Sequence, residues 1–241
     1  MMKSSTPIRQ LGKQIDIIVK EKMVNIGFVE KEKYIFSKLI IKDVEGFVIV
    51  EKTDHGSRYN WSISPTVGII NHKVEDIYYK LVDNIDFSKE LLRTATSSIG
   101  YILPENSFKA WDVNLDDTED QIHEIIDDLI LQIKKYILPF FMKMSQNKEL
   151  QVSLEKNSWG ITSLNYFKVP ILYYINEEKE KGLKYIEDIL AKIRPTPKVN
   201  DLVEPEFNNL EEVKNFFSRD KDILLYWEFV KFRKKFIDLK N

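Results

Sequence analysis

The chain has 241 residues, of which 43% are hydrophobic, and its formal net charge is −2. This hydrophobic content supports a folded core and excludes a disordered chain, while the small net charge gives no general attraction to nucleic acid or anionic membranes. The absence of cysteine excludes disulfides, thiol nucleophiles and cysteine-based metal sites, and it fits a reducing cytosol.

The N-terminal segment has charged residues inside its apolar patch, so it lacks the uncharged stretch of a secretory signal. No window approaches the roughly 18 apolar residues that a membrane helix needs. We therefore expect a soluble cytoplasmic protein that has neither membrane nor nucleic acid as a partner. Its richness in Ile, Lys, Asn and Asp suggests a bacterial source.

The first predicted element is a helix over residues 7–25. Apolar residues recur there at intervals of three and four, and Pro7 occupies a position where helices tolerate proline. Gly27 is a suitable residue to end this helix. Aromatic and β-branched residues then predict strands over residues 33–41 and 47–52.

The centre of the predicted sheet is a hairpin of two long strands over residues 46–71. Apolar and polar residues alternate from Arg58 onward, which is typical of a half-buried strand. Pro65 predicts a break in this second strand, because proline cannot donate a hydrogen bond to a neighbouring strand. The turn of the hairpin is predicted at residues 53–57.

A short helix is predicted at residues 74–82, and two further strands are predicted at residues 97–103 and 108–113. The resulting sheet has about five strands, and its short connections predict that they run antiparallel.

From Thr118 the apolar spacing becomes helical. Thr118 and Gln121 have the spacing of a capping box, and Pro139 is expected to end or kink this helix near Tyr136. Another helix is predicted within residues 170–193, and one or two more after a polar linker that reaches about Asn209.

Helix, strands and further helices in this order predict an α+β fold rather than an alternating parallel one. We expect a single domain over residues 1–241, with a sheet core at about 1–140. The helical C-terminal part, at about 141–241, is expected to pack on the sheet.

The motifs of common enzymes are absent. The sequence contains neither of the usual glycine-rich phosphate loops and no G-x-S-x-G motif, and its histidines are His55, His72 and His123. We therefore expect no cofactor and no catalytic residues, and we favour a role other than catalysis.

One side of the helix after Thr118 offers candidate metal ligands. Glu119, His123 and Asp127 are spaced four residues apart, so they share this side of the helix. With Asp112 they would suit a metal-dependent hydrolase, in which a metal-bound water acts as the nucleophile. The simpler interpretation is a solvated polar face opposite the isoleucine stripe.

Two acidic or polar segments are candidate partner-binding sites. A basic partner would be attracted to the acidic segment, although carboxylates at a helix start also have a structural explanation. The hairpin turn is a loop on a rigid scaffold, although its residues are ordinary turn residues. The candidates are Asp116, Asp117, Asp120, Glu124 and Asp128 in the acidic segment, and Asp54, His55 and Arg58 in the hairpin turn.

Several aromatic residues invite comparison with nucleic-acid-binding surfaces. Tyr59, Trp61 and Trp111 would suit a stacking platform, but few basic residues lie between them, so core packing is the favoured interpretation. The basic C-terminal segment is interpreted as a helix that buries Phe232 and Phe236 and exposes its lysines.

A set of local patterns resembles the bacterial domain-of-unknown-function family numbered 4304 over about residues 8–193. The matching features are Gly27-Phe28 after the first helix, Trp111-Asp112, the segment Ile137–Phe141 and the segment Val169–Leu172. The chain departs from the pattern at Pro65 and after Pro197. The resemblance implies no established activity, and small α+β domains of this kind are similar to immunity proteins that block a bacterial toxin.

The leading hypothesis is therefore a protein-binding module, such as an immunity-type inhibitor, whose partner is a toxin or a second copy of the chain. The alternatives are a metal-dependent hydrolase and a structural protein that associates with itself.

Overall fold

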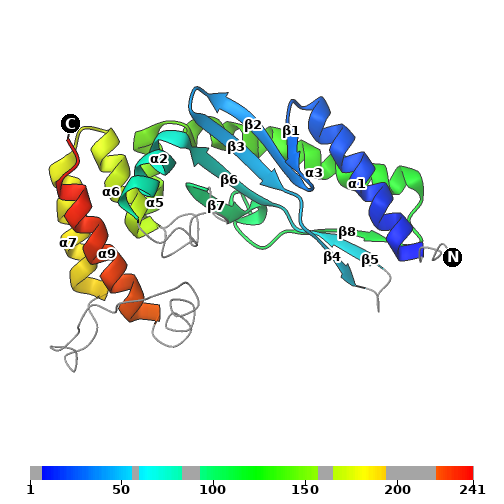
Figure 1. Cartoon of the computed structure of the whole chain (residues 1–241). Coiled ribbons are helices and arrows are strands. Elements are labelled where there is room, and N and C mark those ends of the chain that lie inside the picture. Colours follow the sequence, from blue (N-terminus) through cyan, green and yellow to red (C-terminus); the bar gives the residue numbers. More distant parts are fainter. Residues whose placement is uncertain (1–6, 56–59, 83–92, 157–164, 194–220, 241) are drawn as a thin grey trace. The chain divides into compact units, whose positions relative to one another are not determined.

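The computed structural model describes residues 7–55, 60–82, 93–156, 165–193 and 221–240 (Figure 1). The chain divides into two compact units. The first unit comprises Met1–His72 and Arg93–Ile161, and the second comprises Lys73–Leu92 and Thr162–Asn241. Each unit is therefore built from two separate stretches of the chain.

The first unit contains two antiparallel sheets and four α-helices in the described residues. The strands are β1 (Val29–Glu32), β2 (Ile35–Ile41), β3 (Val44–Ile49), β4 (Lys52–His55), β5 (Asn60–Ile63), β6 (Thr66–Asn71), β7 (Ala95–Ser98) and β8 (Trp111–Asn114). The helices are α1 (Pro7–Asn25), α3 (Glu119–Gln132), α4 (Leu138–Met144) and α5 (Asn147–Glu155). One sheet has the order β1-β2-β3-β6-β7 and the other β4-β5-β8. These elements and the later helices confirm the predicted α+β class.

Helix α1 has the predicted bounds, and its apolar stripe is buried. Gly27 ends it in the left-handed conformation at φ 85°, where the amide of Phe28 donates to the carbonyl of Met23 at 3.1 Å. Behind the larger sheet in Figure 1, α3 runs beside α1, and the two helices are in contact.

The central hairpin is confirmed, but its arms belong to two sheets. β3 pairs with β6 in the larger sheet, and β4 pairs with β5 in the smaller one. The predicted break at Pro65 is confirmed, because it falls between β5 and β6. The prediction of a turn at residues 53–57 is wrong for Thr53, Asp54 and His55, because these residues belong to β4 and pair with β5.

The strand prediction for residues 97–103 is right only for Ser97 and Ser98. β7 ends at Ser98, and a 3₁₀ turn follows over Ile99–Tyr101. Gly100 permits this turn, since an added Cβ there would lie 2.1 Å from the carbonyl oxygen of Ser107. β1 starts directly after Phe28, although Val29-Glu-Lys-Glu lacks the apolar alternation that marks a half-buried strand.

Helical structure continues through Pro139, but the regular α-helix is interrupted near Tyr136, where the sequence predicts an end or a kink. The helix widens into a π-helical segment at Ile133–Ile137 and resumes as α4, in which Pro139 falls in the first turn, where a missing N–H costs little. The ring of Phe141 on α4 packs on Gly46 of β3, where an added Cβ would lie 2.3 Å from the ring. This contact joins α4 to the larger sheet.

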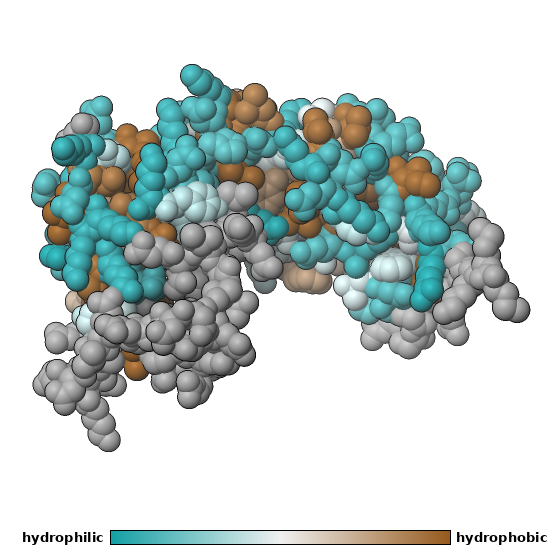
Figure 2. All heavy atoms as spheres, viewed as in Figure 1, coloured by the Kyte–Doolittle hydropathy of each residue, from teal (hydrophilic) through white to brown (hydrophobic). Residues whose placement is uncertain are grey.

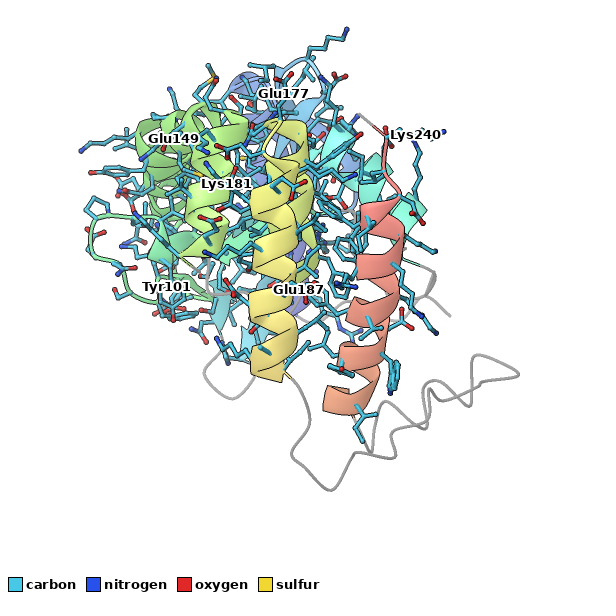
Figure 3. All side chains as sticks on the ribbon, turned by 90° about the vertical axis from the view of Figure 1, so that its left-hand side faces the viewer. Tyr101, Glu149, Glu177, Lys181, Glu187 and Lys240 are labelled. Carbon is cyan, nitrogen blue, oxygen red and sulfur yellow. The ribbon has the colours of Figure 1, made fainter. Side chains whose placement is uncertain are left out.

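The second unit is helical in its described part. Its helices are α2 (His72–Leu81, of which His72 belongs to the first unit), α6 (Asn165–Ile175), α7 (Lys179–Ile193) and α9 (Lys221–Ile237). Figure 3 shows α7 and α9 side by side, and Arg233 of α9 pairs with Glu187 of α7. Phe232 and Phe236 are fully buried, as predicted, and stack on each other at a centroid distance of 5.8 Å.

The two compact units do not divide at residue 140. α4 and α5 belong to the first unit, whereas α2 belongs almost entirely to the second. The expectation of a single domain stays a prediction. The polar linker predicted to reach about Asn209 lies outside the described residues.

Candidate functional site

The three-stranded sheet has one face that packs against α1. Trp61 of β5 donates its indole N–H to the carbonyl of Ile8 at 2.8 Å, and its ring lies against Gly12. Trp111 and Val113 of β8 are 5% and 0% exposed. The predicted core role is confirmed for Trp111, whereas Trp61 is half-buried against α1 and Tyr59 lies outside the described residues.

The opposite face of this sheet carries polar side chains, because successive residues of a strand point to opposite faces. The ladder aligns two rows of three residues across β4, β5 and β8. The rows are His55, Asn60 and Asn114, and Thr53, Ser62 and Asp112. These six side chains are half-buried or exposed, and each has a hydrogen-bonding group.

An acidic turn continues directly from the first row. The backbone N–H of Asn114 donates to Oδ2 of Asp117 at 2.7 Å, which closes the turn between β8 and α3. Thr118 then caps α3: its hydroxyl accepts from the N–H of Gln121 at 3.3 Å, and its own N–H donates to Oε1 of Gln121 at 2.8 Å. The predicted capping box is therefore confirmed.

The two candidate segments therefore lie at the same end of the smaller sheet. His55 pairs with Asn60, Asn60 pairs with Asn114, and Asn114 contacts Asp117. We call this region the acidic end. It consists of Asp54, His55, Asn60, Asp112, Asn114, Asp116, Asp117, Glu119, Asp120 and Glu124.

Most candidate side chains at the acidic end are open to solvent. Asp54, Asp116, Asp120 and Glu124 are exposed, and His55 is half-buried. Arg58 lies outside the described residues. These positions leave the carboxylates accessible to a partner.

Asp128 has a structural role that the sequence did not indicate. Its Oδ2 accepts the indole N–H of Trp111 at 2.7 Å, and its Oδ1 accepts from the amide of Gln132 at 3.1 Å. Partial burial opposes ionisation, but the hydrogen bonds from Trp111 and Gln132 and the charge of Lys109 lower the pKa of Asp128 below its ordinary value. The carboxylate thus joins α3 to β8.

The candidate metal ligands are not assembled into a site. Glu119 and Asp127 are eight residues apart on one helix, an axial separation of about 12 Å, so a second element would have to complete a shared site. Asp127 instead pairs with Lys22 of α1 at 2.6 Å. In the part of the chain that the structure describes, no three His, Asp or Glu side chains are grouped to hold a metal ion.

Among the described residues, no helix is both long enough and apolar enough to cross a membrane. Comparisons of the chain with protein-family models, with curated proteins and with solved structures find no match.

Proposed function

We propose that the chain is a protein-binding module whose acidic end contacts a basic partner protein, in the manner of an immunity-type inhibitor of a toxin. The observation that carries this proposal is the ladder row from His55 through Asn60 to Asn114. This row brings two polar segments, distant in the sequence, to one end of a rigid sheet.

The acidic end presents exposed carboxylates on a backbone that hydrogen bonds hold in place. The Asn114–Asp117 bond and the capping box fix the backbone from which Asp116 and Asp120 project. A fixed array of exposed carboxylates raises the association rate with a basic protein and suppresses acidic partners.

The distribution of hydrophobic residues on the surface favours a polar interface over an apolar one. Figure 2 shows hydrophilic residues over most of the described surface in view, with hydrophobic residues in small groups between them. Large exposed apolar patches mark many obligate interfaces, whereas non-obligate interfaces are about as polar as the remaining surface. A module that binds reversibly through charge fits this pattern.

The decisive experiment compares two variants of the tagged full chain as baits in an extract of its host. The site variant combines Asp116→Asn, Asp120→Asn and Glu124→Gln, which leaves the structural residues Asp117 and Asp128 intact. The control variant removes the same charge at other exposed positions, through Glu21→Gln, Glu180→Gln and Asp188→Asn. Glu180 is a matched control because it also lies in the first turn of a helix.

We expect one stoichiometric basic protein to be captured by the wild type and by the control variant. The site variant should bind it at least tenfold more weakly, and added salt should weaken wild-type binding, because the contact depends on exposed charges. Equal capture by the site variant, or no partner after mild crosslinking, would contradict the proposal.

A further inference from the structure

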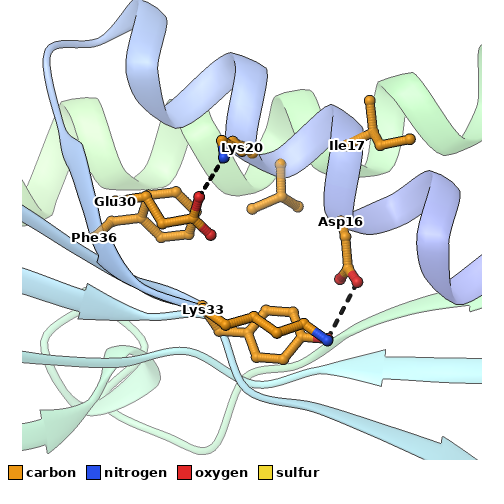
Figure 4. A pocket seen from close by; sticks show the side chains of 8 residues that line it. Asp16, Ile17, Lys20, Glu30, Lys33 and Phe36 are labelled. Atoms are coloured by element: carbon orange, nitrogen blue, oxygen red, sulfur yellow. Dashed lines mark hydrogen bonds and ion pairs between the residues drawn. The ribbon is translucent and has the colours of Figure 1, made fainter.

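A pocket lies between α1 and the β1–β2 hairpin of the first unit (Figure 4). Its volume is about 130 Å³, and its lining is mostly apolar. Val19 and Phe36, which are 3% and 2% exposed, are the most buried of its lining residues. The complete lining is Asp16, Ile17, Val19, Lys20, Glu30, Lys33, Tyr34 and Phe36.

Two polar contacts hold the walls of this pocket. Lys20 of α1 pairs with Glu30 of β1 at 2.6 Å, and the hydroxyl of Tyr34 donates to Asp16 of α1 at 3.1 Å. In Figure 4, dashed lines mark the Lys20–Glu30 pair and the contact of Asp16. Asp16 also pairs with Lys52 of β4. These contacts join α1 to the strands on the other side of the pocket.

Tyr34 has a backbone conformation that tyrosine rarely adopts. Its φ is 70°, in the left-handed region that glycine, asparagine and aspartate tolerate best. The next hairpin of the same sheet has Asp43 at φ 65° in its turn, which is a residue type suited to this conformation. The turn thus does not require a tyrosine, and strained residues of this kind gather at functional sites.

Charge at the mouth of the pocket favours an anion. Each of the two lining carboxylates already has an ammonium partner: Glu30 pairs with Lys20, and Asp16 pairs with Lys52, which lies outside the lining. The ammonium of Lys33 is a further positive charge of the lining. The ammonium of Lys33 is exposed and lies 4.6 Å from the centre of the Tyr34 ring. It is placed to receive an anionic group at the pocket entrance.

We propose that this pocket binds a small carboxylic acid whose hydrocarbon part is about the size of a phenyl ring. An apolar cavity of about 150 Å³ is known to accommodate benzene, so the apolar interior of this pocket suits one such group. The carboxylate of the ligand would pair with Lys33 while its ring contacts Val19, Tyr34 and Phe36. This inference does not depend on the proposed protein partner.

The test is a titration of the full chain with benzoate, in which binding is monitored by the NMR chemical shifts of the pocket residues. Benzyl alcohol serves as the uncharged probe of similar size. Lys33→Gln removes the cation, and Lys31→Gln is the matched control, since it removes an exposed lysine nearby that does not line the pocket. Tyr34→Gly removes one wall and relieves the strained backbone conformation.

We expect benzoate at millimolar concentration to shift the signals of Ile17, Val19 and Phe36 in a saturable manner. Lys33→Gln should weaken benzoate binding about tenfold, as the loss of a charge-assisted hydrogen bond does. Benzyl alcohol should bind the wild type about as weakly as benzoate binds Lys33→Gln, because it has no charge to pair with Lys33. Lys31→Gln should bind as the wild type does.

Tyr34→Gly should abolish binding while its melting temperature stays near that of the wild type, because relief of strain offsets the lost contacts of the ring. The inference is overturned if benzoate shifts no pocket signal saturably. It is equally overturned if Lys33→Gln and Tyr34→Gly bind benzoate as tightly as the wild type does.

Discussion

The carboxylate of Asp128 accepts hydrogen bonds from Trp111 on β8 and from Gln132 one turn further along α3. In the sequence this residue is one of several acids on the polar side of a helix. Only the position of β8 beside α3 gives it a different role from its neighbours. Asp116, in the same acidic segment, is exposed and remains available to a partner.

Asp128→Ala should destabilise the protein by about 1–3 kcal/mol at neutral pH, because it leaves the buried indole N–H of Trp111 without its acceptor. Urea unfolding followed by tryptophan fluorescence measures this change. Asp116→Ala is the control and should alter the free energy of unfolding by no more than about 0.5 kcal/mol.

The effect of Asp128→Ala should also depend on pH. Folding lowers the pKa of Asp128, so the charged carboxylate stabilises the fold above the ordinary aspartate pKa of about 4. This stabilisation is lost as the pH falls through the lower, folded-state pKa. The difference between wild type and variant should therefore shrink on acidification, and a difference that grows instead would exclude this role.

At the scale of elements, a buried ion pair joins α2 to α6. Lys168 is 0% exposed, and its ammonium lies 2.8 and 3.0 Å from the two carboxylate oxygens of Glu75. Burial lowers the pKa of Lys168, and the charge of Glu75 opposes that shift. The surroundings are aromatic, with Tyr78 of α2 packed edge-on against Phe167 of α6 at 6.0 Å.

Lys168→Met should cost about 3–5 kcal/mol, because it leaves the carboxylate of Glu75 buried without its cation. The double variant Lys168→Met/Glu75→Leu should recover most of this loss, since two apolar side chains replace the pair in an apolar environment. Chemical denaturation of both variants measures the coupling. Lys184→Met, at an exposed position of α7, should change little, and a double variant as unstable as the single one would contradict this account.

At the scale of the whole molecule, α2 is inserted between two neighbouring strands of the first unit but belongs to the second. β6 and β7 are antiparallel partners, with Ile69 opposite Ala95, and Thr94 donates its N–H to the carbonyl of Ile69 at 2.8 Å. The ends of these strands are therefore close enough for a short hairpin to join them. The actual connection between β6 and β7 instead contains α2, a helix of the second unit.

A chain that ends at residue 161 should consequently expose apolar surface. Tyr78 and Glu75 would lose Phe167 and Lys168, so the truncated chain should bind a hydrophobic dye and associate, as light scattering would show. Replacing residues 74–92 of this truncated chain with a short Gly-Ser linker should restore a monomer that unfolds cooperatively. A monomeric truncated chain that still contains α2 would contradict this division.

Local patterns allowed much of the architecture to be predicted. The bounds of α1, the capping box of Thr118, the break at Pro65 and the burial of Phe232 and Phe236 depend on residues close together in sequence. Periodic apolar spacing and backbone restrictions operate at that range, so the sequence by itself determined these features.

Only the tertiary structure decided which distant segments meet. It divided the central hairpin between two sheets, brought His55 into a row with Asn114, placed Asp128 beneath Trp111 and assigned α2 to the second unit. Each of these outcomes depends on pairing between residues far apart in the chain. The energy of such a pair depends on burial and geometry that neither sequence segment contains alone.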